Sequence, residues 1–287
     1  MRLSKIITLS GAGLLFAGFG FVHEGVADSS LTYGLSYINN FSSCDADCRK
    51  SQLKYADDQI NQLDTQLRKA GMTKQFKYAN TFVQSTDIVE DFHDGYDYYF
   101  ADNVNLYAIT THGGADDGAY RAVYCSSASP DYRYCRAYSY QIVLGESINN
   151  FNNIYSSHVG KLRWLILSTC HSMDESPMSL WSNTFNYGLD YLLGYKGTMR
   201  LGETTDECLA DFARNAFGGE SKFKKVWFSA NDDWWIDNTA GVFTCGDPLN
   251  PSSSYSDNRR DNYRRTWTPR KIYTSGTFYC SWSYHKG

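Results

Sequence analysis

Two short apolar segments, each followed by a reactive side chain, constrain the fold of this chain more than any other feature. Residues 162–167 are nearly continuous in apolar residues and are followed by Ser-Thr-Cys170. Such a run is typical of a strand that is covered on both faces, as in a parallel sheet flanked by helices. Residues 104–109 form a second apolar strand, which is followed by Thr-Thr-His112. We therefore expect two central strands that lead into Cys170 and His112.

The order of the other predicted elements indicates the fold class. We expect a first strand at residues 33–39 and another short buried strand at 191–195. Apolar residues at helical spacing predict helices at 51–70 and 203–217, and residues 225–230 resemble a strand or a helix. This order predicts an α/β sandwich with a mainly parallel central sheet flanked by helices. In such sheets, catalytic groups collect at the carboxyl ends of the central strands.

The first residues have the features of a signal peptide. Arg2 and Lys5 precede the apolar residues 6–22, and small residues lead up to Ala27. This pattern predicts that residues 1–27 are removed after Ala27 during export. An uncleaved membrane anchor is the alternative, although the apolar run is short for a membrane span. We expect a secreted, extracellular protein without membrane attachment after cleavage.

Export would permit disulfide bonds, and the chain has eight cysteines. Their proximity and their turn-rich surroundings suggest three pairs: Cys44 with Cys48, Cys125 with Cys135, and Cys245 with Cys280. Two cysteines then remain, Cys170 and Cys208, and they could pair with each other, because sequence alone does not determine connectivity. The fate of Cys170 matters for function, since a nucleophile must be a free thiol or thiolate.

The folded part is expected to be one domain with an attached tail. Residues 28–245 contain no low-complexity linker and are predicted to form the α/β domain. From Gly246 the sequence becomes rich in Ser, Asn and Arg, and later aromatic and alternating. We therefore predict that residues 246–287 form a tail, which packs on the domain and is held by a Cys245–Cys280 disulfide.

The predicted sheet would bring a thiol and an imidazole to one edge. The carboxyl ends of neighbouring parallel strands lie about 5 Å apart, or about 10 Å if one strand intervenes. Cys170 would supply a nucleophilic sulfur, and His112 would supply the proton transfer that helps a leaving amine depart. Gly113 has no side chain beside His112. Its N–H could therefore face a developing oxyanion, together with the N–H of Cys170.

Two segments, Tyr107-Ala-Ile-Thr-Thr-His-Gly113 and Trp164-Leu-Ile-Leu-Ser-Thr-Cys170, resemble the pattern that caspase, legumain and gingipain peptidases share. In that pattern one strand ends in His-Gly, and a later strand ends in a small residue, any residue and Cys. The resemblance implies a caspase-like three-layer sandwich, with His112 as general acid/base and Cys170 as nucleophile, and it implies no cofactor.

Over roughly residues 33–245 the chain is similar to a family of secreted bacterial caspase-like proteins. The matching pieces are Asp102-Asn-Val-Asn-Leu-Tyr107, Leu162-Arg-Trp164, Tyr191-Leu-Leu-Gly-Tyr195, Lys225-Val-Trp-Phe228 and Asp232-Asp233. Two features depart from the peptidases. The Tyr-rich residues 118–139 lengthen the interval between the His and the Cys, and His171 stands where a Gly or Arg is common. A shared fold does not by itself imply a shared activity.

These observations predict a secreted cysteine peptidase that acts on a peptide or protein substrate without a metal or other cofactor. The net charge of −4 argues against nucleic acid as the main partner, because phosphate binding needs a basic surface. The alternative function is a catalytically inactive, secreted binding protein that keeps the caspase-like fold. A fast-reacting Cys170 thiol that depends on His112 would favour the enzyme.

The same residues also permit other interpretations. Cys170 could be an inert buried thiol, and His112 could be a structural histidine in a Gly-rich turn. Cys170, His112 and His171 could together bind zinc. The acidic pairs Asp116-Asp117 and Asp232-Asp233 could bind calcium, although they lack the spacing of a calcium loop.

Aromatic and hydroxyl side chains offer two further alternatives. Trp227, Trp234 and Trp235 could stack on sugars or peptides, although aromatic clusters are more often part of a core. Ser168 lies beside Cys170 but lacks a Gly-x-Ser-x-Gly elbow, so the sequence does not favour a serine hydrolase.

Overall fold

The computed structural model describes most of the predicted domain. The described residues are 31–44, 46–90, 93, 95–116, 119–125, 135–142, 146–147, 158–159, 161–174, 181, 189–203, 205–218, 222–232, 237–245 and 280–286. The predicted signal peptide, residues 1–27, lies outside them, and so do residues 246–279 of the predicted tail. Trp234, Trp235, Asp117 and Asp233 also lie outside the described residues.

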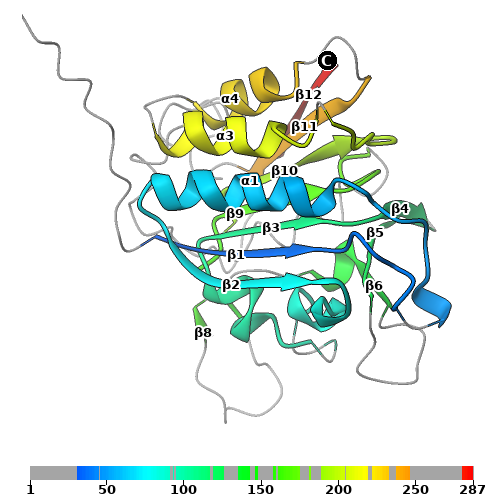
Figure 1. Ribbon diagram of the computed structural model, residues 1–287. Coiled ribbons are helices and arrows are strands. Elements are labelled where there is room, and N and C mark those ends of the chain that lie inside the picture. Colours follow the sequence, from blue (N-terminus) through cyan, green and yellow to red (C-terminus); the bar gives the residue numbers. More distant parts are fainter. Residues whose placement is uncertain are drawn as a thin grey trace, which may run out of the picture.

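The described residues form a central sheet of seven strands, with the order β12-β11-β10-β9-β3-β1-β2 (Figure 1). Its strands are β1 (Thr32–Tyr37), β2 (Thr73–Ala79), β3 (Leu106–Thr110), β9 (Trp164–Ser168), β10 (Tyr191–Lys196), β11 (Thr239–Cys245) and β12 (Cys280–Lys286). The neighbours from β2 to β10 pair in parallel, whereas β11 and β12 are antiparallel additions. The predicted α/β class with a mainly parallel sheet is confirmed.

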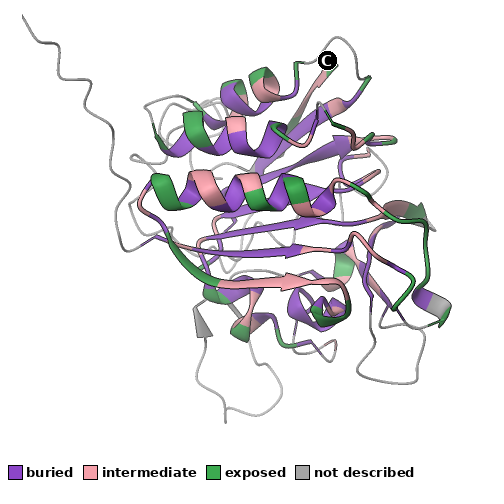
Figure 2. Ribbon diagram, viewed as in Figure 1, coloured by how far each residue is buried: buried purple, intermediate pink, exposed green. Residues whose placement is uncertain are grey.

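In the described part of the chain, three helices cover one face of this sheet: α1 (Ala56–Lys69), α3 (Cys208–Phe217) and α4 (Phe223–Ala230). Helix α1 turns Ile60, Leu63 and Leu67 inward, and its outward residues are exposed in Figure 2. These side chains pack in one cluster with alternate residues of the central strands, such as Leu106 and Ile166. The apolar spacing that predicted the helices is therefore the face that they bury against the sheet.

The other face of the sheet packs against short elements. The other strands among the described residues are β4 (Gly113–Asp116), β5 (Ala119–Val123), β6 (Arg136–Tyr138), β7 (Glu146–Ser147) and β8 (His158–Val159). The 3₁₀ helices are η1 (Ala46–Cys48), η2 (Asn80–Phe82), η3 (Ser85–Asp87), η5 (Asp97–Tyr99), η6 (Ala101–Asn103) and η8 (Ser139–Gln141). A second core cluster joins these elements to Tyr107, Ile109, Leu165 and Leu167 of β3 and β9. The two strands are thus buried on both faces, which the composition of residues 162–167 predicted for β9.

Two edge strands were not predicted from the sequence. Strand β2 carries Lys74 and Lys77 and is only partly buried, so it lacks the apolar run of a central strand. Both lysines face Asp64 of α1, at 3.0 Å and 3.7 Å. At the other edge, β12 comes from the end of the predicted tail and pairs with β11. The last described residues therefore belong to the central sheet.

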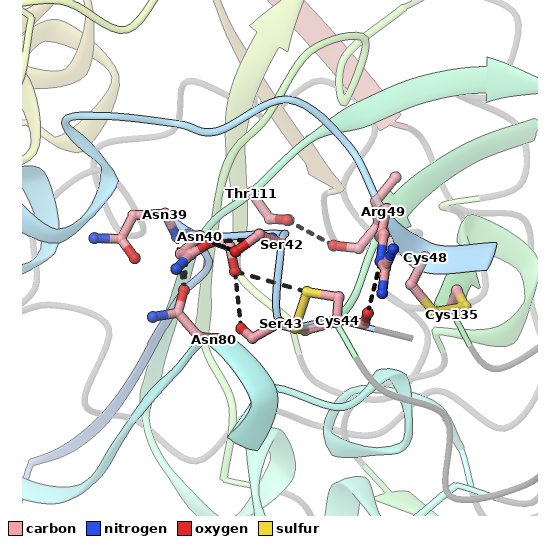
Figure 3. Close-up of a disulfide and its surroundings, with 12 residues drawn as sticks. Asn39, Asn40, Ser42, Ser43, Cys44, Cys48, Arg49, Asn80, Thr111 and Cys135 are labelled. Atoms are coloured by element: carbon pink, nitrogen blue, oxygen red, sulfur yellow. Dashed lines mark hydrogen bonds between the residues drawn. A yellow bond between two sulfur atoms is a disulfide. The ribbon is translucent and has the colours of Figure 1, made fainter. Parts of the chain in front are cut away.

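Among the residues that the structure describes, two disulfides are formed, with a different pairing from the one predicted. Cys44 is bonded to Cys125, with Cα atoms 4.6 Å apart, and Cys48 to Cys135, with Cα atoms 5.3 Å apart. The predicted Cys44–Cys48 and Cys125–Cys135 pairs are therefore wrong. The turn that holds Cys44 and Cys48 packs against the segments that hold the other two, so each cysteine bonds across this contact. Figure 3 shows the bond between Cys48 and Cys135.

The third predicted disulfide stays a prediction. Cys245 and Cys280 are directly opposite each other in the β11–β12 register. Opposed residues of antiparallel strands have Cα atoms about 4.5–5.5 Å apart, a separation that a disulfide can span. The side chains of these two cysteines lie outside the described part of the structure.

Candidate active site

Strands β3 and β9 are immediate neighbours in the sheet, as the Cys–His hypothesis requires. They pair in parallel, with Thr110 opposite Ser168. His112 and Cys170 each follow two residues after this pair. The backbone also stays close beyond the strands, because a Cβ atom on Gly113 would lie only 2.2 Å from the carbonyl oxygen of Cys170. The structure thus brings the His112–Gly113 segment against the Cys170 backbone.

One glutamine joins the ends of the two strands. The hydroxyls of Thr110 and Ser168 both donate to Oε1 of Gln59 in α1, each at 2.7 Å. Gln59 is itself buried, and its Nε2 donates to the carbonyl oxygen of Thr205. This network was not predicted from the sequence, although Gln59 is a polar residue on the apolar face of α1. It ties β3, β9 and the helix layer together just before the candidate residues.

His112 has a defined ring orientation. Its Nε2 donates to the carbonyl oxygen of Ser51 at 2.8 Å, and the hydroxyl of Ser51 lies 3.3 Å from the same nitrogen. Because a carbonyl can only accept, this contact assigns the proton of the neutral ring to Nε2 and leaves a lone pair on Nδ1. The ring also packs near Phe41, with centroids 5.1 Å apart.

The surroundings of His112 favour the neutral ring. Burial lowers the pKa of His112 below its usual 6.5, and the positive charge of Lys50 lowers it further. The Ser51 carbonyl acts in the opposite direction, because it stabilises the protonated ring. The result is an imidazole that can accept a proton on Nδ1 near neutral pH.

Cys170 is a free, partly exposed thiol. Its Sγ accepts a hydrogen bond from the backbone N–H of Met199 at 3.3 Å and lies 3.6 Å from the carbonyl oxygen of the same residue. Cys208 is in no disulfide either, and it is buried at the start of α3. The alternative Cys170–Cys208 disulfide is therefore not formed.

A second histidine lies directly after the candidate nucleophile. His171 has a φ of 61°, in the left-handed region that non-glycine residues rarely adopt. Its Nδ1 lies 2.7 Å from Oδ2 of Asp174, and Oδ1 of Asp174 accepts the N–H of Gly197 at 2.6 Å. Sequence reasoning treated His171 only as a departure or a metal ligand. The Cys-His-x-x-Asp spacing was the signal that could have indicated this pair.

Gly113 is the first residue of β4 and is opposite Ala122 of β5. The carbonyl oxygen of the preceding His112 accepts the N–H of Val123 at 2.9 Å. The segment after β3 thus begins a small antiparallel sheet whose first strand lies against Cys170. The proposed use of the Gly113 N–H as an oxyanion donor stays a prediction.

The structure provides evidence on several alternatives that the sequence permitted. Within the described ranges, no group of three or more His, Cys, Asp or Glu residues could hold a metal ion. Ser168 is buried and bonded to Gln59, so its hydroxyl is not exposed as a nucleophile. Trp227 is buried in the helix-side core, where it cannot stack on an external ligand. Among the residues that the structure describes, no helix has the length and apolarity to span a membrane.

The comparisons with known proteins give one family and a distant structural likeness. No curated protein matches the sequence. One of the solved structures that match is the crystal structure of the Drosophila initiator caspase Dronc, with 9% sequence identity and a TM-score of 0.42. That match covers 84% of this chain and 91% of the Dronc chain. Residues 35–264 match the model of a family described as "Domain of unknown function (DUF6345)", and the chain belongs to this family.

Proposed function

We propose that this protein is a secreted cysteine peptidase in which Cys170 is the nucleophile and His112 the general acid/base. The observation that carries the proposal is the in-register adjacency of β3 and β9, which lead into an imidazole and a free thiol. The ring of His112 has its proton assigned to Nε2, so Nδ1 is the atom that can accept a proton. These are the two groups that thiol-based acyl transfer needs.

The proposed reaction follows from these two groups. Nδ1 of His112 takes the proton of the Cys170 thiol, and the thiolate attacks the scissile carbonyl carbon. The N–H groups of Gly113 and Cys170 stabilise the oxyanion. His112 then gives its proton to the leaving amine, and a thioester remains on Cys170. A water molecule that is deprotonated by His112 hydrolyses the thioester, which releases the acid and restores the free thiol.

Two features support an extracellular site of action. The two disulfides are of a kind that persists in oxidising compartments. The N-terminal residues have the pattern of a cleavable signal peptide, with Arg2 and Lys5 before an apolar run and Ala27 at the expected cut. A peptide or protein outside the producing cell is therefore the proposed substrate, and the reaction as written needs no cofactor.

One observation favours a second function, that of an inactive binding protein with the same fold. Both backbone polar groups of Met199 contact the sulfur of Cys170. If the Met199 segment stays in place, it occupies one side of the thiol and limits access to it. A thiol that resists alkylation in the folded protein would support this second function.

The test is peptide-library cleavage by the protein that begins at residue 28. We expect cleavage by the wild type and by Cys208→Ala, which removes the buried thiol of α3. We expect none by Cys170→Ala and at least about a hundredfold less by His112→Ala. If neither the wild type nor Cys170→Ala cleaves any peptide, the proposal of a peptidase loses its support. Equal cleavage by these two proteins would assign the activity to other residues.

A further inference from the structure

His112 is held from two sides by two different segments of the chain. Its main-chain carbonyl accepts the N–H of Val123 in β5, and its ring donates to the carbonyl oxygen of Ser51. Ser51 lies in the segment that connects β1 to α1, whereas Val123 lies in the hairpin that follows His112. The orientation of the ring therefore depends on how these two segments are placed relative to each other.

Both disulfides join these same two segments. Cys44 and Cys48 belong to the segment of Ser51, and Cys48 precedes Ser51 by three residues. Cys125 follows Val123 by two residues and is bonded to Cys44. Cys135 is bonded to Cys48, and its carbonyl oxygen accepts the N–H of Tyr124. The bridges thus connect the two partners of His112 near the histidine itself.

Other contacts fix the two ends of the segment that contains Ser51. Figure 3 shows Arg49 turned back to the carbonyl oxygen of Cys44, at 3.3 Å, and the Cys48–Cys135 bond beside it. The N–H of Leu53 donates to the carbonyl oxygen of Asn39 at 3.0 Å. Between Cys48 and Leu53 the chain is exposed. Ser51 therefore lies in a short exposed stretch whose N-terminal anchor is a buried disulfide.

We propose that the Cys44–Cys125 and Cys48–Cys135 disulfides are positioning elements, which hold the Ser51 carbonyl against His112 and so keep the ring proton on Nε2. For catalysis this inference rests on the proposed peptidase function, but the ring orientation itself does not. The Cys48–Cys135 disulfide has a larger effect on the position of the Ser51 carbonyl than Cys44–Cys125 has, because Cys48 is the cysteine nearest to Ser51 in the sequence. Without the bridges, the exposed stretch gains conformational freedom and water competes for Nε2.

The test measures the ring of His112 directly. Long-range ¹H–¹⁵N NMR spectra at pH 8 distinguish a ring protonated on Nε2 from one protonated on Nδ1, and His112→Ala identifies the signals. We expect only the Nε2–H form in the wild type and a mixture of both forms in Cys48→Ala/Cys135→Ala. Cys44→Ala/Cys125→Ala gives a smaller change in the same direction. Ser51→Ala is the matched control, because it keeps the carbonyl, and it retains the wild-type form.

Alkylation of Cys170 by iodoacetamide is the second measurement. In the Cys208→Ala background, we expect the rate at pH 6.5 to fall on the order of tenfold when Cys48 and Cys135 are replaced. If a double variant does not fold, two glycines inserted between Arg49 and Lys50 keep both bridges but uncouple Ser51 from Cys48. This insertion is expected to give the same mixture of ring forms.

The outcomes separate the two proposals. A folded double variant, or the insertion variant, that keeps only the Nε2–H form overturns the positioning role of the disulfides. A changed ring form supports that role whether or not a peptide is cleaved. Silence of the wild type in the cleavage assay, together with a changed ring form in the variants, contradicts the peptidase and leaves the positioning role standing.

Discussion

Gly113 lies so close to Cys170 that a Cβ atom on the glycine would be 2.2 Å from the carbonyl oxygen of the cysteine. The same atom would be 3.0 Å from Cβ of Thr169. The neighbours of this site are backbone and a β-branched side chain, which have little freedom to move away. The contact is what brings the segment after β3 against the segment after β9.

We therefore expect Gly113→Ala to lower the free energy of unfolding by about 1–3 kcal/mol, because the added methyl group overpacks this contact. It should also slow the alkylation of Cys170. Urea unfolding measures the first effect. Gly202→Ala is the control, since a Cβ there meets no atom within 4 Å, and it should change stability by less than about 0.5 kcal/mol. Equal effects of the two variants would contradict the packing argument.

Gln59→Leu tests the buried acceptor that Thr110 and Ser168 share. The substitution leaves two buried hydroxyls without the oxygen to which they donate. We expect the free energy of unfolding to fall by about 2–5 kcal/mol, since each unsatisfied buried group costs about 1–3 kcal/mol. Gln62→Leu on the same helix removes a half-buried hydrogen bond to Asp206 and should cost clearly less. Urea unfolding of the two variants under identical conditions measures both changes in the free energy of unfolding.

Asp87 should make stability depend on pH in an unusual direction. Burial raises the pKa of this carboxyl to about 7, and the hydrogen bond from the N–H of Gln84 offsets only part of the effect. Between about pH 4 and pH 7 the folded state then binds more protons than the unfolded state. The contribution of Asp87 to stability therefore falls as pH rises through this window.

Asp87→Asn removes that dependence. The difference in free energy of unfolding between the variant and the wild type should shift in favour of the variant by on the order of 2–4 kcal/mol from pH 4 to pH 8. Chemical denaturation at several pH values measures it. Asp58→Asn, at an exposed position of α1, is the control. A constant difference across the range for Asp87→Asn would rule out the raised pKa.

Cys170 and Cys208, which are in no disulfide, should differ in reactivity. Cys170 is partly exposed, whereas Cys208 is buried at the start of α3. We expect iodoacetamide to label Cys170 in the folded protein and Cys208 only after denaturation, as measured by peptide mass spectrometry. His112→Ala should slow the labelling of Cys170, and His171→Ala should not if His112 is the base. If His171→Ala slows the labelling and His112→Ala does not, the general base is the His171–Asp174 pair.

Lys50 should contribute to the lowered pKa of His112. Its positive charge lowers the pKa of His112, in addition to the larger effect of burial. We expect Lys50→Glu to raise the pKa of His112, so that the ring stays protonated to a higher pH. NMR titration of the ring measures this change. Lys54→Glu introduces the same charge change at another exposed position and should have a smaller effect. Indistinguishable titrations for these variants would contradict the direct charge interaction.

The central strands and the two residues that follow them were predictable from the sequence. Strands buried on both faces need apolar residues at nearly every position, and this requirement is visible locally in residues 104–109 and 162–167. The helix of residues 51–70 was predictable for a similar reason, although the structure begins it at Ala56. One face of this helix is exposed and the other is buried, so apolar residues recur in the sequence at the helical period.

Only the tertiary structure decided the disulfide pairing, the Ser51 carbonyl at His112 and the shared contact to Gln59. Each of these joins residues that are far apart in the chain, through a backbone atom or a polar side chain that can bond to many partners. Such contacts produce no periodic pattern and no local bias in composition, because they depend on which surfaces pack together. The sequence therefore indicated where a thiol and an imidazole would emerge, and long-range packing determined how each is held.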